Sequence, residues 1–232
     1  MFINIKDARK HYGEGETLVN ALDGVSLSLN EGKIYVILGP SGSGKSTLLN
    51  MIGGLDSLDS GEITIADRNI SGSDKKKLID YRREDVGFVF QFYNLIPDLT
   101  VQENIEVVLD ISKNPLDIEE VMTALDIEKY RNRFPKELSG GQQQRAAIAR
   151  ALIKNPKILL CDELTGALDS KSSRSVLKFI EKINEQFKTT IIIITHNEAI
   201  ADMADSVIRI KDGRIADYTE NSHKLSAEEL AL

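Results

Sequence analysis

The sequence has little that would tie it to an oxidising compartment or to the interior of a bilayer. Its single cysteine, Cys161, cannot form an internal disulfide, which fits a reducing compartment. No apolar run approaches the roughly 20 residues that a membrane-spanning helix needs. The polar N-terminus, with Lys6, Asp7 and Arg9, does not resemble a signal peptide. We therefore expect a soluble, cytoplasmic protein in which Cys161 serves packing.

Basic residues are also fewer than acidic residues. The chain has 29 Lys and Arg against 36 Asp and Glu, a formal net charge of −7. This balance argues against a protein that binds nucleic acid by bulk electrostatic attraction, so no nucleic-acid partner is expected. Internal repeats and low-complexity tracts are absent from the sequence as well. At 232 residues, 41% of them hydrophobic, the chain can bury a substantial core as one large domain or a domain plus a subdomain.

Two kinds of strand pattern are present. Near the N-terminus, Ile3 and Ile5 alternate with polar residues, and a second alternating segment, residues 25–30, follows an expected turn near Asp23-Gly24. Such alternation predicts half-solvated antiparallel strands. Continuous apolar runs instead predict parallel strands covered on both faces, and they occupy residues 34–38, 86–90, 158–161 and 191–194.

Helical patterns lie between the apolar runs, which predicts an α/β core. They cover residues 45–52, 142–153 and 172–183, and a polar helix start is expected near Asp74. The section from Thr100 to Tyr130 is helical throughout apart from a break at Asn114-Pro115, with Thr100 and Glu103 spaced as a capping box. This section predicts a small helical subdomain.

A glycine-rich loop follows the first apolar run. Two glycines, a lysine and a hydroxyl stand at the spacing of a phosphate-binding loop, and a helix is predicted to begin at Lys45. Glycines permit close backbone approach to an anion, while the helix N-terminus directs free N–H groups at phosphate oxygens. Lys45 would reach the β- and γ-phosphates, and Ser46 would offer its hydroxyl to Mg²⁺. The predicted nucleotide-binding residues here are Gly39, Ser41, Gly42, Ser43, Gly44, Lys45, Ser46 and Thr47.

A phosphate loop alone leaves kinases, GTPases, motors and transport ATPases open. The apolar run at residues 158–161 ends in Asp162 and Glu163. In this arrangement the first acid can hold Mg²⁺ and the second can polarise an attacking water. The pair therefore favours a nucleotide hydrolase.

A second anion site is predicted at the start of another helix, where Ser139 is a plausible N-cap before Gly140 and Gly141. One nucleotide carries only one set of phosphates. The economical explanation is that this helix closes on the γ-phosphate held by a second copy of the chain.

Residues 138–142 read L-S-G-G-Q, and at this segment the chain resembles the ABC-type ATPases and little else. The resemblance extends over nearly the whole chain through residues 39–47, Gln91, Asp162-Glu163, Leu168-Asp169 and His196, in the expected order. Within the family the chain is most similar to the ATPase subunits that serve FtsX-like permeases, the MacB, LolD and bacitracin-exporter type. That narrower resemblance rests on LLNMIGGLDSLDSGEI, VGFVFQFYNLIPDLTVQENI and TGALDS.

The resemblance implies a role for each matching residue. Tyr12 would stack on adenine, Glu163 would activate the attacking water, and His196 would hydrogen-bond the γ-phosphate. Gln91 would reach both the Mg²⁺ and the water, so the implied metal-binding set is Ser46, Gln91 and Asp162. At the contact between two copies, the implied residues are Ser139, Gly140, Gly141, Gln142 and Asp169.

The resemblance also implies a fold with three parts. A P-loop NTPase core with a parallel sheet and an N-terminal antiparallel β subdomain would occupy residues 1–92 and 138–218. The α-helical subdomain would occupy residues 93–137, and a C-terminal tail residues 219–232. Two departures from the family pattern stand out. Leu164 replaces the usual proline, which should loosen the loop to Asp169, and the interval from Gln91 to Leu138 is short.

The sequence therefore predicts an ATP-hydrolysing, Mg²⁺-dependent subunit that forms a homodimer around ATP and drives a membrane permease. It would lie peripherally on the inner face of the membrane. One alternative is a soluble ABC-type ATPase that works on nucleic acid or in cofactor assembly, although the long inserts or double cassettes of such proteins are missing. Another is a nucleotide-gated signalling or scaffolding protein without turnover, against which the presence of Glu163 and His196 argues.

Overall fold

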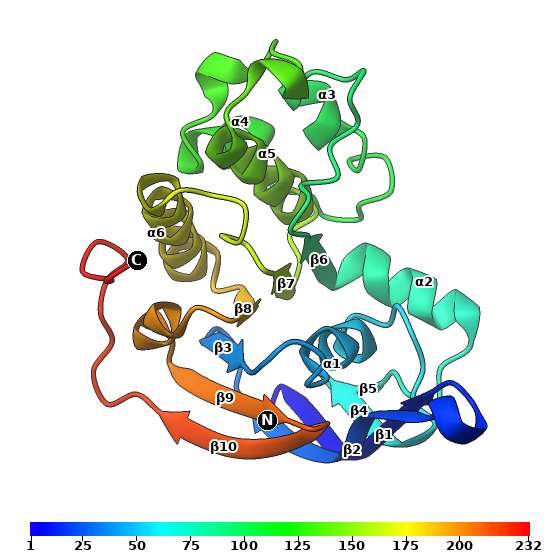
Figure 1. The fold of residues 1–232 in the computed structure, drawn as a ribbon. Helices are drawn as coiled ribbons and strands as arrows, with labels where there is room; N and C mark the ends of the chain where they lie inside the picture. The colour runs from blue at the N-terminus through cyan, green and yellow to red at the C-terminus, as the bar shows by residue number, and fades with distance from the viewer.

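The computed structural model contains two sheets with helices packed around them (Figure 1). It describes the whole chain from Met1 to Leu232 except for the side chain of Glu16. A six-stranded sheet runs through the centre, and a four-stranded antiparallel sheet lies below it in Figure 1. The expected α/β fold with an additional antiparallel sheet is confirmed.

The six-stranded sheet has the strand order β10-β9-β3-β8-β7-β6. Five neighbouring strands are parallel to one another, namely β9, β3, β8, β7 and β6, whereas β10 pairs antiparallel with β9. The buried apolar runs form its centre because strands covered on both faces need no polar alternation. The strands are β3 (Ile34–Leu38), β6 (Val86–Val89), β7 (Ile158–Asp162), β8 (Thr190–Thr195), β9 (Ser206–Lys211) and β10 (Arg214–Glu220).

The antiparallel sheet has the order β2-β1-β4-β5. Its strands are β1 (Ile3–Tyr12), β2 (Val19–Leu29), β4 (Ser60–Ile65) and β5 (Arg68–Asn69). The turn expected near Asp23-Gly24 is wrong, because β2 continues through both residues. Gly24 has a φ of +81° and lies where the pairing of β1 with β2 shifts register. A glycine in a strand serves a bulge here rather than a turn.

Helices cover both faces of the central sheet. On one side lie α1 (Lys45–Ile52) and α2 (Lys75–Glu84), and on the other α5 (Gly140–Leu152) and α6 (Ser170–Phe187). Short helices α3 (Val101–Glu106) and α4 (Ile118–Ala124) pack against α5 in the upper part of Figure 1. The expected cap of α3 is present, because Thr100 and Glu103 form a capping box. Among the described residues, no helix combines the length and the apolar character that crossing a membrane requires.

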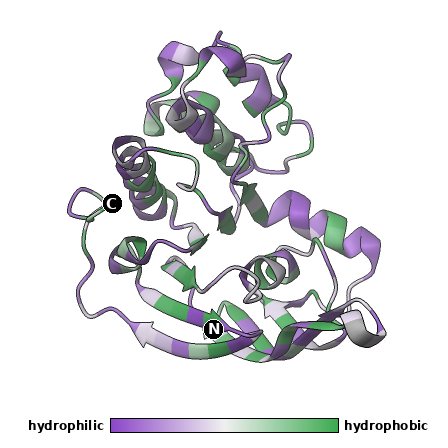
Figure 2. Ribbon diagram, in the orientation of Figure 1, coloured by the Kyte–Doolittle hydropathy of each residue, from purple (hydrophilic) through white to green (hydrophobic). Residues whose placement is uncertain are grey.

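Alternate residues of the central strands divide the core into two clusters. Val36, Leu159 and Ile193 face α5 and α6, whereas Tyr35 and Ile192 face α1 and the antiparallel sheet. Figure 2 shows the central strands as mainly hydrophobic and much of α2 and β10 as hydrophilic. Cys161 is fully buried in the first cluster, which confirms its packing role. The proposed division at residues 92–93 and 137–138 stays a prediction, since α5 packs with both α3 and α6.

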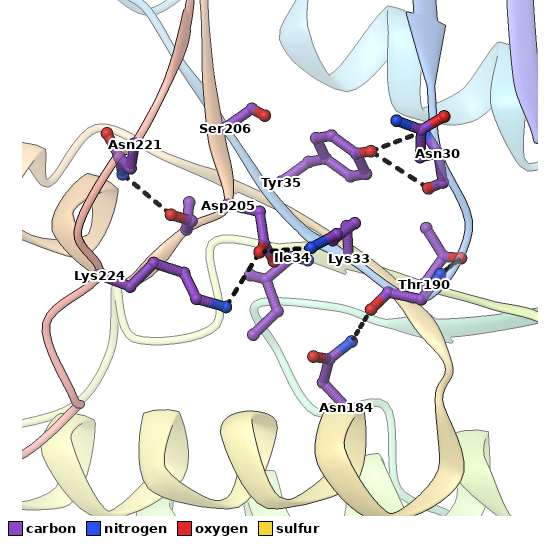
Figure 3. A network of polar contacts seen from close by, with 12 residues as sticks. Asn30, Lys33, Ile34, Tyr35, Asn184, Thr190, Asp205, Ser206, Asn221 and Lys224 are labelled. Atoms are coloured by element: carbon purple, nitrogen blue, oxygen red, sulfur yellow. Dashed lines mark hydrogen bonds and ion pairs between the residues drawn. The ribbon is translucent and has the colours of Figure 1, made fainter. Parts of the chain in front are cut away.

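The C-terminal tail after β10 returns along α6 and is held by a polar network (Figure 3). The Asp205 carboxylate accepts the backbone N–H of Ile34 at 2.8 Å and pairs with Lys224 of the tail at 3.0 Å. Asn221 donates to backbone carbonyls at residues 201 and 204. Further on, Ala227 and Leu230 are buried against the core. The predicted tail begins at residue 219, but β10 continues to Glu220. The tail that follows it, residues 221–232, packs against the rest of the fold.

Candidate active site

The phosphate loop joins β3 to α1, as the sequence predicts. A glycine is required at Gly44, the N-cap of α1, because its φ is +104° and a Cβ there would overlap the carbonyl oxygen of Ala21. Gly39 is constrained in a different way, because its φ is not positive. A Cβ at Gly39 would overlap the carbonyl oxygen of Ile210, so close approach and not backbone conformation excludes other residues.

Lys45 lies across the mouth of this loop. Its Nζ donates to the carbonyl oxygens of Gly39 at 2.7 Å and Pro40 at 2.8 Å. Burial lowers the pKa of Lys45, and the nearby Glu163 and Asp162 carboxylates oppose that change. A cation held among oxygen atoms in a partly dry loop can exchange these carbonyls for anionic phosphate oxygens, which are better acceptors.

The predicted carboxylate pair lies at the carboxyl end of β7, with Asp162 as its last residue and Glu163 directly after it. Strand β8 separates β7 from β3, the strand that leads into the phosphate loop. Burial raises the pKa of Asp162, and the adjacent negative charge of Glu163 raises it further. Ser46 and Lys45 oppose this rise through a hydrogen bond and a positive charge. The Ser46 hydroxyl and the Asp162 carboxylate are therefore close together. This is an oxygen donor set with excess negative charge, the chemistry that suits a hard divalent cation such as Mg²⁺.

Glu163 occupies a left-handed backbone conformation, with a φ of +50°. Its N–H donates to the carbonyl of Ile194 in β8 at 3.0 Å, which fixes the residue against the neighbouring strand. The Nδ1 atom of His196, just beyond β8, lies 3.2 Å from Oε1 of Glu163. The structure thus brings together two predicted site residues from different strands.

Gln91 lies beyond the end of β6, and its side chain reaches the same region. The amide Nε2 is 3.1 Å from the position that a Cβ of Gly166 would take, and Gly166 follows Glu163 in a tight turn. The predicted catalytic side chains Gln91, Glu163 and His196 therefore meet at the carboxyl ends of β6, β7 and β8. Ligands of open α/β sheets bind at this edge.

The L-S-G-G-Q segment opens α5 with the predicted cap. Ser139 Oγ accepts the N–H of Gln142 at 3.4 Å, and Gln142 Oε1 accepts the N–H of Ser139 at 2.9 Å. The glycines permit close packing: a Cβ at Gly140 would approach Tyr93 and Leu168, and one at Gly141 would approach Ser172. No hydrogen bond joins this segment to the phosphate loop among the described residues. The two predicted anion sites are separate within one chain.

Asp169 caps α6 through Ser172, whose backbone N–H and hydroxyl donate to its two oxygens at 2.9 and 2.8 Å. These hydrogen bonds lower the pKa of Asp169. Leu164, which stands where the family has proline, is 2% exposed and packs in the core cluster that faces α5 and α6. An apolar anchor therefore ties down the start of this loop, in place of the ring constraint that proline would supply.

Tyr12 ends β1 beside the loop and is 42% exposed. Its hydroxyl donates to Oδ2 of Asp56 at 2.8 Å, and Thr47, in the first turn of α1, lies nearby. The ring predicted to stack on adenine is thus placed next to the phosphate site.

Contacts that the sequence pattern does not reveal hold these loops in place. Arg150 of α5 donates to the carbonyl of Tyr93 at 3.2 Å, which joins the loop after Gln91 to the signature helix. The N–H of Gly213, in the turn between β9 and β10, donates to the carbonyl of Ser43 at 3.0 Å. A glycine after Asp212 signals a turn, but only the folded chain shows what the turn touches.

The comparisons with known proteins agree with this geometry. The ABC transporter family model matches residues 22–166. A putative ABC transporter ATP-binding protein of Mycoplasma pneumoniae is 44% identical over 220 residues, covering 93% of this chain and 65% of the relative. The macrolide export ATP-binding/permease protein MacB of Hyphomonas neptunium is 42% identical over 97% of this chain and 36% of its own length. The chain thus spans about a third to two-thirds of these relatives.

Other relatives match over almost their full length. An uncharacterised ABC transporter ATP-binding protein of Methanocaldococcus jannaschii is 43% identical over 92% of this chain and 94% of the relative. A dimeric structure of that cassette, bound to ADP and Pi, matches with a TM-score of 0.84 and 39% identity over 94% of this chain and 98% of the solved chain. Sequence, fold and site geometry agree, and this chain belongs to the ABC transporter family as an ATP-binding cassette.

Proposed function

We propose that the chain binds ATP with Mg²⁺ and hydrolyses it to ADP and phosphate, using Glu163 as the general base. The observation that carries this proposal is the meeting of the phosphate loop, Asp162-Glu163 and His196 at the carboxyl ends of adjacent strands β3, β7 and β8. The solved relative that contains ADP and Pi supports the same chemistry.

Ser46, Asp162 and Gln91 would hold the Mg²⁺, which would supply positive charge beside the β- and γ-phosphates. Lys45 binds the same oxygens once they replace the carbonyls of Gly39 and Pro40. The backbone N–H groups at the start of α1 contribute further donors. Together these groups neutralise the triphosphate.

Glu163 would take a proton from the attacking water. Its pairing with His196 at 3.2 Å restrains the direction of the carboxylate, and its left-handed backbone conformation is of the kind found at functional sites. The Gln91 amide, next to Gly166, offers the water a neutral hydrogen-bond partner. His196 is mostly exposed, so in one chain this side of the site is open to solvent.

A second copy of the chain would close that open side. Ser139, Gly140 and Gly141 would contact the γ-phosphate bound by the partner, because they are separate from the phosphate loop of their own chain. The dimeric structure of the archaeal relative, which is bound to ADP and Pi, supports the formation of a dimer. Asp169, at the start of α6 beside these glycines, would lie at the same contact.

We also propose that the dimer drives an FtsX-like permease and lies peripherally on the inner face of the membrane. The similarity to MacB, whose name joins ATP-binding and permease functions, supports this partner. Large apolar side chains are exposed near the helical part of the chain, at Phe92 (77%), Val107 (48%) and Ile111 (51%). Exposed apolar groups of this kind suit a docking surface.

The Glu163→Gln variant tests the enzymatic proposal, because an amide keeps the shape but cannot accept the proton. We expect phosphate release to fall by about two orders of magnitude or more, while ATP affinity is retained and an ATP-bound dimer appears in size-exclusion chromatography. The matched control is Glu62→Gln, the same change at a β4 carboxylate whose one hydrogen bond among the described residues comes from the Asn69 amide. Unchanged phosphate release in Glu163→Gln would refute the assignment.

A further inference from the structure

Two acidic residues lie in the loop between α1 and β4, and the proposed function gives them no role. Asp56 and Asp59 both contact the last residues of β1. Asp59 Oδ2 accepts the backbone N–H of His11 at 2.6 Å, whereas Asp56 accepts the hydroxyl of Tyr12 at 2.8 Å. Only Asp56 therefore bonds the side chain that is proposed to meet the nucleobase.

We propose that Asp56 is a positioning residue that orients the Tyr12 ring for the nucleobase, with Lys10 covering the ring face that the base does not use. This inference rests on the proposed ATP binding and extends it to the base end of the nucleotide. Asp56 acts through Tyr12 and does not itself touch the ligand.

The Asp56 carboxylate is well restrained for such a role. One oxygen, Oδ1, accepts the N–H of Ser57 at 2.7 Å and the ammonium of Lys10 at 3.3 Å, which leaves Oδ2 for Tyr12. Partial burial opposes ionisation, but the hydrogen bonds from Ser57, Tyr12 and Lys10 hold the pKa of Asp56 below its usual value. A charged, fixed acceptor gives the phenol a single preferred direction.

Lys10 closes one face of the ring. It is 9% exposed, its Nζ donates to the carbonyl of Ser57 at 2.7 Å, and the same atom lies 5.2 Å from the centre of the Tyr12 ring. A cation at this distance is attracted to the ring face. Tyr12 is nevertheless 42% exposed, so an area of ring remains for a flat base to stack on.

The same loop links the base end of the site to the phosphate end. Asp56 follows α1, and the first residue of α1 is Lys45, the proposed phosphate ligand. Tyr12 also lies near Thr47 in the first turn of α1. Through its bond to Asp56, the ring is therefore tied to the loop that directly follows the helix of the proposed phosphate site.

A double-mutant cycle measures whether Asp56 acts through the Tyr12 hydroxyl. We expect Asp56→Asn and Tyr12→Phe each to weaken ATP binding about fivefold, the effect of one hydrogen bond. The double variant should be no weaker than either single variant, because both changes remove the same contact. Binding of inorganic triphosphate, which has no base, should be unchanged in all three. Isothermal titration calorimetry reads both ligands.

A spectroscopic readout separates positioning from a general structural role. Burial and the bond to Asp56 raise the pKa of Tyr12. An ultraviolet titration, with Tyr12→Phe as the subtraction, should show this phenol ionising at lower pH in Asp56→Asn. The control is Asp7→Asn, the same change at a carboxylate in β1, the strand that carries Tyr12; among the described residues it pairs only with Arg9, in an exposed ion pair. It should alter neither ATP affinity nor the phenol titration.

Three outcomes are distinguishable. Additive losses in the cycle, or equal losses for ATP and triphosphate, would mean that Asp56 supports α1 and would overturn the inference. Unchanged ATP affinity in Asp56→Asn would overturn it as well. If the unmodified chain bound neither ATP nor triphosphate, the proposed function itself would fail, and Asp56 would not be the cause.

Discussion

Two residues in loops of the candidate active site have unusual backbone conformations. Glu163 and Tyr93 are non-glycine residues with φ values of +50° and +47°, and both lie in loops that follow strands of the central sheet. Such conformations persist only when surrounding contacts enforce them. The conformation of Glu163 is held by the hydrogen bond from its N–H to the carbonyl of Ile194. The conformation of Tyr93 is held by Arg150, which donates to the carbonyl of Tyr93. The backbone at the catalytic loop is therefore held by β8 and α5.

Lys154 is a half-buried cation whose only hydrogen bond among the described residues goes to a neutral acceptor, and its charge should lower the stability of the fold at neutral pH. Its Nζ donates to the carbonyl of Arg82 at 2.8 Å, and burial lowers its pKa to about 8. Below pH 8 the lysine is charged in the folded and the unfolded chain, so the full cost is present. Between pH 8 and the ordinary value of 10.5, only the folded chain loses the proton, and stability rises with pH.

We therefore predict that Lys154→Met stabilises the protein at pH 7 by up to about 3.5 kcal/mol, which is about 1.4 kcal/mol for each unit of the pKa difference between about 8 and 10.5. The advantage should shrink as pH approaches 10.5, the ordinary value for lysine. Urea unfolding at pH 7, 8.5 and 10 measures it, with Lys6→Met on β1 as an exposed control. A variant less stable than the parent at pH 7 would show that the bond to Arg82 outweighs the burial.

At the scale of elements, the sequence predicts what local periodicity decides. The predicted helix at residues 45–52 and strand at residues 34–38 match α1 and β3 in both bounds. The hairpin of β9 and β10 is missed because β10 is exposed along most of its length and shows no buried alternation. Ser226 and Glu229 have the spacing of a capping box, which would predict a short helix after Ser226. Its cap with Glu229 forms, but the structure has only a turn there, and a single turn without further residues does not propagate.

The candidate site divides in the same way. Short contiguous motifs predict three features of the site: the phosphate loop, the acids at the end of β7 and the cap at Ser139. The structure has each of them in the expected local geometry. The roles of these residues in catalysis stay predictions. Contacts between distant segments, such as Asp56 with Tyr12 or Gly213 with Ser43, leave no local pattern. A single sequence therefore does not indicate which of its distant segments lie in contact.

The C-terminal tail should respond to acid through Asp205. Hydrogen bonds from the N–H of Ile34, from Lys224 and from Lys33 lower the pKa of Asp205 despite its burial. The stabilisation is present above the unfolded value of 3.8 and is lost as pH falls through the lower folded value. We predict that Asp205→Asn lowers the free energy of unfolding by about 2 kcal/mol at pH 7.

The difference between Asp205→Asn and the parent should narrow below about pH 4, because protonation then removes the charge in both states. Guanidinium unfolding across this pH range measures it, and limited proteolysis should release the tail more easily in the variant. The comparison variant is Glu220→Gln, at an exposed residue at the end of β10. A constant difference between Asp205→Asn and the parent at all pH values would contradict the ionic explanation.

For the whole molecule, the separation of the signature segment from the phosphate loop is the basis for our proposal that two chains together form each active site. We predict that Ser139→Arg leaves ATP affinity of the monomer nearly unchanged and abolishes turnover, since Ser139 would act on the partner's nucleotide. A Lys45→Ala variant should lose tight ATP binding, because the ammonium that would replace its carbonyl bonds with phosphate oxygens is gone.

Mixing the two inactive variants tests this directly. Each heterodimer contains one site with intact Lys45 and Glu163 on one chain and intact Ser139 on the other, so phosphate release should recover to at most about half of the parental rate, which is one of two sites. Crosslinking must show that heterodimers form, because hydrolysis that needs both sites closed would reduce the recovery. Loss of ATP binding by the Ser139→Arg monomer would mean that the segment serves its own chain.

The phosphate loop is supported by contacts with a segment much later in the sequence, so these contacts can form only after most of the chain has been synthesised. Gly39 packs against the carbonyl of Ile210, and Ser43 accepts its hydrogen bond from Gly213, near the other end of the chain. A nascent chain that has emerged only through α1 carries the complete motif but not its supports. Nucleotide should therefore be captured late in translation, after the β9–β10 turn has left the exit tunnel, and an N-terminal fragment with an intact motif should not bind it.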